Sequence, residues 1–397
     1  MQKTQFKIEK KSWLKSFYNF LINLFIGVII SSITFLITFH ILEKYFADQY
    51  TNSKSTPKTA MNLQIYQESP NRSWDHKPFA EAEHGFGYPT PKIKINSIGL
   101  RNEEIPQEKT NQRFLMLGDS FTFGMGVDQD KTFSVRVQEG FGTKKQNIIN
   151  AGVIGQTIDD AFMYLKYQGM SLKPDFVIYN FFVGNDVTEL KRHKWKEDEA
   201  GNIVNVQDNE LYVDKENRLR LKGKSSPKSF FLFWLKQKLE IIKQKYSPSE
   251  EIFDPTLTWP IFLSENHELQ DEHLEEYWIK FEEILKQINA FCEKKNIKFF
   301  IGVIPMDVQV SKQYWKKYPN LPFDDEAFKM QRPQKRIKEL GEKYGIKIFD
   351  ALPILKHEES INGSFYFDED PHFNVLGHRF YGAYLWRFIV NEFFKKY

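Results

Sequence analysis

A small set of side chains in this chain has the chemistry needed to make and break an acyl ester. Ser120 follows a Gly-Asp pair, and His372 lies near the C-terminus. A serine hydroxyl is a poor nucleophile until a neighbouring imidazole takes its proton, and that imidazole needs a carboxylate to hold its tautomer. Ser120 would supply the hydroxyl and His372 the base. The carboxylate would come from Asp370 or Glu369, two and three residues before the histidine.

The tetrahedral intermediate of such a reaction needs donors for its negatively charged oxygen. We predict three: the backbone N–H groups of Ser120 and Gly155, and the side-chain amide of Asn185. Neighbouring residues are expected to shape the loops that carry these groups, and they are Asp119, Gly184 and Asp186. Each group follows a short apolar run, which is where an α/β protein places its reactive loops.

Those apolar runs predict the sheet that must position the loops. The runs read as strands, and they are Arg113–Leu117, Asn147–Asn150, Phe176–Phe182, Lys298–Ile304 and Lys347–Phe349. They are apolar on both faces, which is typical of parallel strands covered on both sides. A further short strand is predicted at Lys92–Asn96. Strand and helix alternate along the chain, so we predict a three-layer α/β/α fold.

Amphipathic stretches between the runs predict the helices of that fold. They are Phe133–Gly140, Ile158–Gln168, Leu269–Lys294, Asp325–Tyr344 and Val375–Phe394. Thr157 and Asp160 are predicted to form a capping box at the second of these, and Asn374 to cap the last. A charged stretch from about 188 to 265 interrupts the alternation. We interpret it as an insertion with hairpin-like segments and a helix at Phe230–Lys245, lying over the strand ends.

The N-terminal region has the composition of a membrane anchor. Residues 17–42 contain no Asp, Glu, Lys or Arg, and a helix of that length spans a bilayer core of about 30 Å. Five lysines precede the segment and Lys44 alone follows closely, so the positive-inside rule places the N-terminus in the cytoplasm. We therefore divide the chain into a basic tail (1–16), a transmembrane anchor (17–42), a stalk (43–84) and a catalytic domain (85–397).

Charge and cysteine content exclude several other classes of protein. The net charge of +3 divides into +4 over residues 1–16 and −1 over the rest, so it reports membrane orientation and predicts no nucleic-acid partner. A single cysteine excludes an intramolecular disulfide framework and a thiolate-rich metal site. The Gly-containing segment around Ser120 lacks the Lys-Ser/Thr of a phosphate-binding loop. We predict neither a cofactor nor a metal site.

The four polar loops together resemble the blocks of the SGNH hydrolases, also called GDSL-type esterases. The counterparts are the GDS serine, the glycine of the second loop, Gly-Asn-Asp in the third, and the acid–histidine element near the C-terminus, in this order over about two-thirds of the chain. The preceding KINSIGLRNEE segment is similar to one in membrane-anchored bacterial members. The resemblance implies a flavodoxin-like fold, Ser120 as nucleophile, His372 as base, and Gly155 and Asn185 as oxyanion donors.

Two positions depart from the family pattern. Val183 stands where the third block usually has glycine, and Glu369 stands where the strict D-x-x-H pattern has aspartate. Asp370 fits a D-x-H variant of the family, so we predict Asp370 as the triad acid and keep Glu369 as the alternative.

The resemblance, combined with the anchor, predicts an esterase in the inner membrane with its catalytic domain in the periplasm. The expected partners are the membrane and an O-acylated glycan or lipid of the cell envelope as substrate. One alternative is an O-acyltransferase that passes the same acyl group to a polysaccharide. A second is a non-catalytic glycan-binding or assembly protein on the same fold. The sequence makes no prediction of the oligomeric state.

Overall fold

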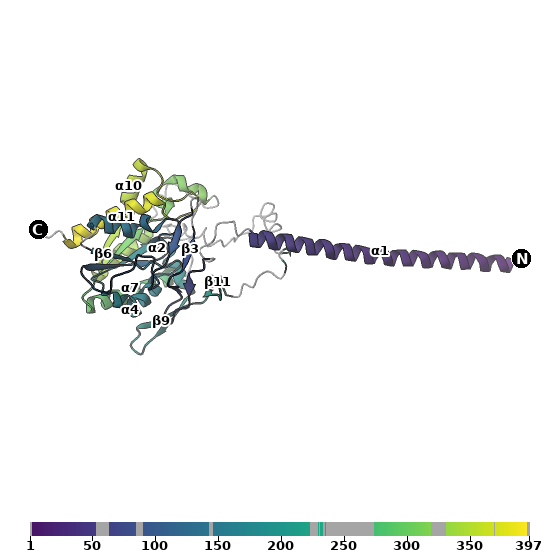
Figure 1. The fold of residues 1–397 in the computed structure, drawn as a ribbon, viewed down its shortest axis with the longest axis horizontal. Helices are drawn as coiled ribbons and strands as arrows, with labels where there is room; N and C mark the ends of the chain where they lie inside the picture. The colour runs from purple at the N-terminus through teal and green to yellow at the C-terminus, as the bar shows by residue number, and fades with distance from the viewer. Residues whose placement is uncertain are drawn as a thin grey trace. The chain divides into compact units, whose positions relative to one another are not determined.

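A parallel sheet of five strands forms the centre of the folded part of the computed structural model (Figure 1). The structure describes residues 2–52, 63–84, 90–142, 146–222, 229, 231–232, 235, 274–318, 331–368 and 370–394. The five strands are β5 (Gln112–Gly118), β6 (Gln146–Asn150), β7 (Phe176–Phe182), β12 (Lys298–Ile304) and β13 (Lys347–Asp350). Their spatial order is β13-β12-β7-β5-β6, and every neighbouring pair is parallel. The predicted strands of this sheet are therefore confirmed.

Helices cover both faces of the sheet. On one face α3 (Phe133–Phe141) packs against α11 (Val375–Ile389), and on the other α4 (Ile158–Tyr167) packs against α7 (Leu274–Lys294) (Figure 1). All seven residues of the central strand β7 are buried between these layers. This arrangement confirms the three-layer α/β/α prediction, because a parallel strand must be apolar on both faces when helices cover both.

Two further helices complete the layers. α9 (Arg332–Tyr344) lies beside α7, to which it is joined by the ion pairs Arg336–Glu275 (2.8 Å) and Lys343–Glu282 (2.6 Å). The short helix α10 (Leu352–Asn362) was not predicted from the sequence. α11 ends at Ile389 and continues as a π-helical turn, Val390–Phe394, within the predicted range.

The predicted domain boundary at residue 85 is wrong, because residues 63–84 are part of the fold. The segment contains β1 (Tyr66–Gln67), β2 (Asp75–His76) and β3 (Glu81–Glu83), and β3 pairs with β4 (Lys92–Lys94). Its apolar side chains are buried in a second core with Phe123, Val153 and Ile154, and they include Leu63, Ile65, Tyr66 and Trp74. Polar neighbours separate these apolar residues in the sequence, so no apolar run marks the segment as folded.

The insertion begins with two antiparallel hairpins. β8 (His193–Glu197) pairs with β9 (Ile203–Asp208), and β10 (Leu211–Val213) pairs with β11 (Leu219–Leu221). The first hairpin lies along α4, where Lys166 Nζ donates to the carbonyl of Ile203 (3.0 Å). The second belongs to the second core. The predicted helix at 230–245 falls almost entirely outside the described residues, of which Phe231, Leu232 and Leu235 are helical.

α1 (Gln2–Asn52) belongs to one of the two compact units of the chain, and the catalytic fold belongs to the other. Its apolar part, Phe17–Tyr45, is long enough to cross a membrane. The helix continues ten residues past the predicted end of the anchor at Leu42, so the first part of the predicted stalk is helical. Glu43 accepts hydrogen bonds from the Ser229 hydroxyl and from the Phe231 N–H (3.2 Å).

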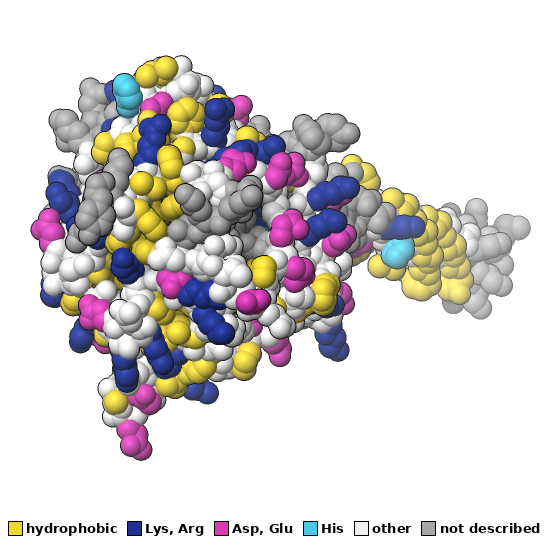
Figure 2. Space-filling model, turned by 60° about the vertical axis from the view of Figure 1, so that its left-hand side comes forward, with side chains coloured by type: hydrophobic (Ala, Val, Ile, Leu, Met, Phe, Trp, Pro, Cys, Tyr) yellow, Lys and Arg dark blue, Asp and Glu magenta, His cyan; other side chains and the backbone are white. Residues whose placement is uncertain are grey.

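Charged side chains of both signs are mixed on the face of the molecule shown in Figure 2. Lysine and arginine side chains lie next to aspartate and glutamate side chains across this face, with hydrophobic side chains between them. The small net charge of the chain is therefore not gathered into a single basic area on this face.

Candidate active site

Ser120, His372 and Asp370 lie in one chain of hydrogen bonds. Ser120 is the first residue of α2 (Ser120–Phe123), two residues after the end of β5, and its Oγ lies 2.7 Å from Nε2 of His372. Nδ1 of His372 lies 2.5 Å from Oδ1 of Asp370, so the ring proton belongs on Nδ1 and Nε2 is left to accept from the serine. Glu369, the alternative acid, lies outside the described residues.

The turn that carries Ser120 depends on its two preceding residues. Asp119 caps α2 by accepting a hydrogen bond from the Phe121 N–H (2.9 Å). Gly118 has φ +147°, and a Cβ there would lie 2.9 Å from the backbone oxygen of Asn180 on β7. Only glycine fits this close approach, so the Gly-Asp pair has a structural role in presenting the serine hydroxyl.

Arg101, which the sequence analysis did not single out, holds the other end of the nucleophile turn. Its buried guanidinium donates to the carbonyls of Phe123 (3.1 Å), Gly124 (2.6 Å) and Val127 (2.6 Å). The carbonyls at a helix C-terminus have no partners within the helix, so a buried cation is a favourable donor to them. Arg101 lies in the KINSIGLRNEE segment. The resemblance of this segment to one in membrane-anchored SGNH hydrolases was the signal that could have pointed to Arg101.

A buried ion pair holds the loop that carries His372. Lys317 Nζ lies 2.9 Å from Oδ2 of Asp307 and donates to the carbonyl oxygens of Phe367 and Asp370 (3.0 Å to the latter). This ion pair was not predicted from the sequence. Asp307 comes three residues after the end of β12, in a loop at the same edge of the sheet, so its position was a usable signal.

The predicted oxyanion donors have no protein acceptor within the described part of the chain. Neither the Ser120 N–H, the Gly155 N–H nor the Asn185 side-chain amide donates to another described residue. Gly155 has φ +74°, and a Cβ there would lie 3.3 Å from the Trp74 ring. These amides are therefore available to a bound oxyanion.

The residues that flank Asn185 hold its loop in place. Asp186 Oδ2 accepts hydrogen bonds from the Tyr179 hydroxyl (2.8 Å) and the Phe182 N–H (2.9 Å). Gly184 lies against the Phe182 ring, and a Cβ at this position would lie 2.5 Å from the nearest ring atom. Val183, the departure from the family pattern, is buried and its N–H donates to Ile304 on β12 (3.2 Å).

The charges around the triad favour an imidazolium that is paired with Asp370. Burial lowers the pKa of His372, but Asp370 opposes it and raises the pKa above the ordinary histidine value of 6.5. Burial raises the pKa of Asp370, and the contact with His372 outweighs that effect and lowers it. Burial raises the pKa of Asp119 to about 7. Asp370 is therefore the ionised carboxylate that stabilises a protonated His372.

Two smaller predictions about helix caps have different outcomes. The Asn374 side chain accepts hydrogen bonds from the N–H groups of Leu376 (2.9 Å) and Gly377 (3.1 Å), so the predicted N-cap of α11 is confirmed. The predicted capping box at Thr157 is wrong, since its side chain caps no N–H group. The Thr157 hydroxyl donates instead to Asp159, a residue of a buried polar cluster described below.

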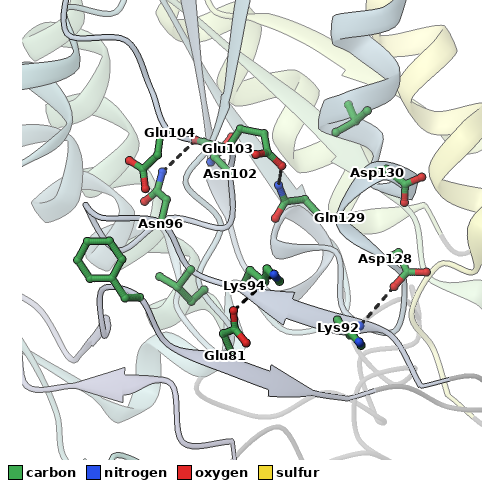
Figure 3. Close-up of a pocket in the computed structure, with 13 residues that line it drawn as sticks. Glu81, Lys92, Lys94, Asn96, Asn102, Glu103, Glu104, Asp128, Gln129 and Asp130 are labelled. Carbon is green, nitrogen blue, oxygen red and sulfur yellow. Dashed lines mark hydrogen bonds and ion pairs between the residues drawn. The ribbon is translucent and has the colours of Figure 1, made fainter.

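A groove of about 680 Å³ lies beside β3 and β4 (Figure 3). Its polar lining comes from the segments around β3 and β4, from the residues after Arg101, and from Asp128–Asp130. None of the predicted site residues lines it. Lys94 pairs with Glu81 and the Lys92 N–H is hydrogen-bonded to Asp128 (3.3 Å), so these polar groups satisfy one another.

Comparison with known proteins finds similarity at the level of solved structures. No family model matches the chain, and no curated protein matches it. Similar structures include an acetyl xylan esterase (14% identity, TM-score 0.38, covering 70% of this chain and 99% of that one). A G-D-S-L family protein from Desulfitobacterium hafniense (12%, 0.35, 70% and 99%) and the lipase/acylhydrolase from Enterococcus faecalis (14%, 0.35, 70% and 96%) are also similar.

Proposed function

We propose that this chain is a serine esterase of the SGNH class. The observation that carries the proposal is the continuous chain of hydrogen bonds from Ser120 Oγ through His372 to Asp370, at 2.7 and 2.5 Å. A hydroxyl, an imidazole and a carboxylate in these contacts form the apparatus that activates serine for attack on a carbonyl. The four sequence blocks that resemble the SGNH hydrolases supply these same residues.

The reaction follows from the positions of the groups. As Ser120 Oγ bonds to the ester carbonyl carbon, its proton moves to Nε2 of His372 and the carbonyl oxygen becomes negatively charged. The free amides of Ser120, Gly155 and Asn185 are the donors for that oxygen. Collapse of the intermediate breaks the ester C–O bond, and His372 gives its proton to the departing alcohol. Water, deprotonated by the same imidazole, then releases the acid from the acyl-serine.

The proposed location is the outer face of the inner membrane. Phe17–Tyr45 is long and apolar enough to cross a membrane, and the five lysines that precede it favour a cytoplasmic N-terminus. A catalytic domain on that side would meet O-acyl groups, acetyl among them, on glycans or lipids of the cell envelope. We propose these as the substrate class.

The first experiment compares ester hydrolysis by the full-length protein and by Ser120→Ala in detergent. We expect the parent to hydrolyse p-nitrophenyl acetate and to be labelled by a fluorophosphonate probe. Ser120→Ala should lose the label and at least about 10³-fold in kcat. Ser171→Ala, an exposed serine, is the matched control and should behave as the parent.

The same experiment separates the alternatives. If Ser120→Ala hydrolysed the ester as fast as the parent, the assignment of the nucleophile would be wrong. A parent with neither hydrolysis nor labelling would indicate a non-catalytic binding protein. Acyl transfer to an added oligosaccharide without release of free acid would indicate an acyltransferase.

Topology is tested by labelling single cysteines in cells. In a Cys292→Ser background, Glu199→Cys lies on the exposed turn between β8 and β9, and Lys10→Cys lies before the anchor. A membrane-impermeant maleimide should label the first but not the second after the outer envelope is permeabilised. The reverse pattern would contradict the proposed orientation.

A further inference from the structure

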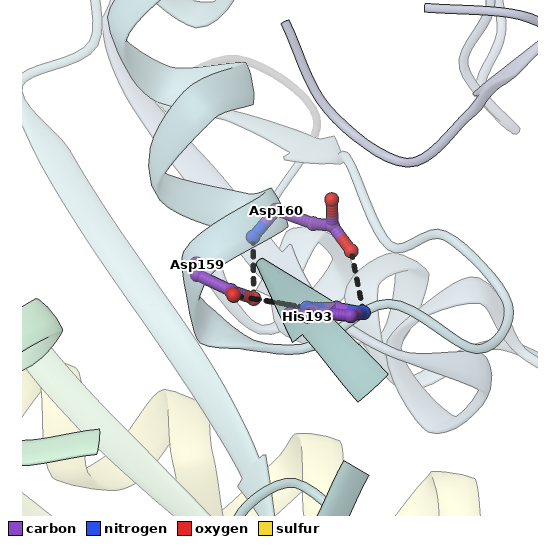
Figure 4. A group of neighbouring side chains, drawn as sticks. All are labelled: Asp159, Asp160 and His193. Carbon is purple, nitrogen blue, oxygen red and sulfur yellow. Dashed lines mark hydrogen bonds and ion pairs between the residues drawn. The ribbon is translucent and has the colours of Figure 1, made fainter. Parts of the chain in front are cut away.

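A second group of buried polar side chains lies between α4 and the β8–β9 hairpin (Figure 4). It contains Asp159 and Asp160 of α4 and His193 at the start of β8, whose ligand atoms lie within 4.8 Å of one another. Asp208, at the end of β9, adjoins them. These side chains are at most 1% exposed. Burial of so many ionisable groups costs several kcal/mol per ion unless partners compensate them, and the proposed esterase reaction uses none of them.

Asp159 orients the imidazole of His193. Both of its carboxylate oxygens lie 2.9 Å from Nδ1 of the ring, and it also accepts from Trp195 Nε1 (2.7 Å) and the Thr157 hydroxyl. A carboxylate saturated in this way places the ring proton on Nδ1. Nε2 of His193 then presents its lone pair to the opposite side, which is how carboxylate–histidine pairs hold metal ions in proteins.

Two carboxylate oxygens lie near Nε2 of His193 on that opposite side. Nε2 of His193 lies 3.7 Å from Oδ2 of Asp160 and 3.6 Å from Oδ2 of Asp208. Nε2 of His193 and Oδ2 of Asp160 have no hydrogen-bond partner among the residues that the structure describes, whereas Oδ2 of Asp208 lies 3.2 Å from Arg192 Nε in an ion pair. The separations are too long for hydrogen bonds. The two separations from Nε2 are close to the edge of about 3.4 Å in a tetrahedron with metal–ligand bonds of about 2.1 Å.

Both carboxylates are held with one oxygen turned toward His193. Oδ1 of Asp160 accepts the Ser73 N–H (2.8 Å), and Oδ1 of Asp208 accepts the N–H groups of Glu210 and Leu211 (2.7 Å each). The backbone therefore fixes each side chain by one oxygen and leaves the other directed into the cluster. Such preorganisation is typical of ligand carboxylates.

The surrounding charges leave the cluster negative. Three cationic side chains reach it. Arg192 Nε lies 3.2 Å from Oδ2 of Asp208, Arg72 pairs with Asp75, and Lys280 Nζ donates to the carbonyl of His193 (3.3 Å). The carboxylates in this group outnumber these cations by two, and they are Asp75, Asp159, Asp160, Glu189 and Asp208. A divalent cation would balance that excess of negative charge.

We propose that His193, Asp160 and Asp208 bind a divalent transition-metal ion, with Zn²⁺ as the best fit to one imidazole nitrogen and two carboxylate oxygens. Asp159 holds the imidazole from behind. His193 binds as the neutral ring, so any proton on Nε2 leaves when the metal enters.

The place of the site in the fold indicates a structural role. α4 follows the loop of Gly155, and β8 follows the loop of Asn185 through the 3₁₀-helix Thr188–Arg192. Arg192 also donates to the Gly155 carbonyl (3.2 Å). A metal ion bound at the cluster would link α4 to β8. It would therefore fix the positions of the two loops that carry the predicted oxyanion donors.

The test measures metal content and thermal stability of the full-length protein in detergent, purified without chelators and without a histidine tag. We expect about one zinc ion per chain by mass spectrometry. Removing it with dipicolinate should lower Tm by about 5 °C, and Zn²⁺ but not Ca²⁺ should restore it.

Variants assign the metal to the cluster. His193→Gln should retain less than about a tenth of the zinc, and Asp159→Asn should weaken zinc binding by about 10- to 100-fold. His378→Gln removes another buried histidine and should keep the zinc, which makes it the matched control. If His193→Gln does not fold, the zinc affinity of Asp159→Asn and the change in Tm of the parent protein with Zn²⁺ still test the proposal.

Two results would overturn the proposal. One is a parent protein that purifies without metal and shows no Tm change with Zn²⁺, in which case a protonated His193 balances the carboxylates. The other is equal zinc in His193→Gln and the parent. Neither measurement uses ester hydrolysis, so the outcome is independent of the proposed esterase activity.

Discussion

The proton that Ser120 loses must be accepted by His372, so the pKa of this imidazole sets the pH range of the reaction. Asp370 raises that pKa above 6.5, against the opposite effect of burial. Because the neutral ring is the active form, we expect kcat/KM to be lost as pH falls and to rise through an inflection above 6.5. A pH profile with an aryl ester measures it. A flat profile between pH 5 and 9 would contradict this role.

Asp370→Asn should change both the rate and the pH profile. The substitution removes the charge that raises the pKa of His372 and the partner that holds its tautomer. We expect kcat to fall by about 10²- to 10⁴-fold and the inflection to move to lower pH. Asp368→Asn, an exposed neighbour, is the control. A larger loss in Glu369→Gln would show that the alternative acid is the functional one.

The Asn185 side-chain amide should matter to catalysis more than to stability. It has no protein acceptor among the described residues, so Asn185→Ala breaks no hydrogen bond of that amide and removes one donor from the oxyanion. We expect kcat to fall by about 10²- to 10³-fold with Tm nearly unchanged. Asn362→Ala, on the exposed surface of α10, serves as the comparison. Equal rates for the two variants would remove Asn185 from the site.

At the scale of elements, the loops between strands and helices position the site. Substitutions in the loop of Gly155 test whether this loop contributes an oxyanion donor. Gly155 (φ +74°) and Gly201 (φ +76°) both have left-handed backbone conformations. A Cβ at Gly155 meets the Trp74 ring at 3.3 Å, whereas nothing lies within 4 Å at Gly201. Alanine at either position should therefore cost about 1–2 kcal/mol of stability from backbone strain.

Only Gly155→Ala should also lower kcat, because the shift that relieves the Trp74 contact moves the Gly155 N–H away from the oxyanion. Chemical denaturation measures the first effect and ester hydrolysis the second. Equal kcat for Gly155→Ala and Gly201→Ala, at equal loss of stability, would show that this loop does not contribute a donor.

At the scale of the whole molecule, the second core extends the catalytic fold toward the N-terminus. Leu63, Ile65 and Trp74 are buried in it, and Trp74 Nε1 donates to the Ile154 carbonyl (3.2 Å) next to Gly155. We expect a chain that starts at Pro57 to be folded and to hydrolyse esters as the parent does. A chain that starts at Gly85 should be insoluble or inactive, because it leaves that core open.

Trp74→Ala in the full-length chain isolates the same effect. Removing this buried ring should cost about 3–5 kcal/mol, measured by chemical denaturation. Phe79→Ala, whose ring is 73% exposed in the same segment, should cost far less. If a chain that starts at Gly85 were stable and active, residues 63–84 would not be needed for folding, as expected for the predicted stalk.

The sequence by itself determined the strands of the sheet and the residues of the candidate triad. Apolar runs such as Phe176–Phe182 form strands because their pattern is local, and the predicted bounds of β7 and β12 agree with the structure. Ser120, Asn185 and His372 could be predicted as site residues because each lies in a short polar block beside such an element. The boundary at 85 failed because the apolar residues before it are scattered among polar ones.

Only the tertiary structure decided which distant residues meet. Arg101 reaches the turn after Ser120, and Lys317 with Asp307 holds the loop of His372. Asp160, His193 and Asp208 lie on three separate elements, and no spacing in the chain marks them as a group. The physical reason is the same in each case: chain topology, rather than any local pattern, sets which buried charges become neighbours.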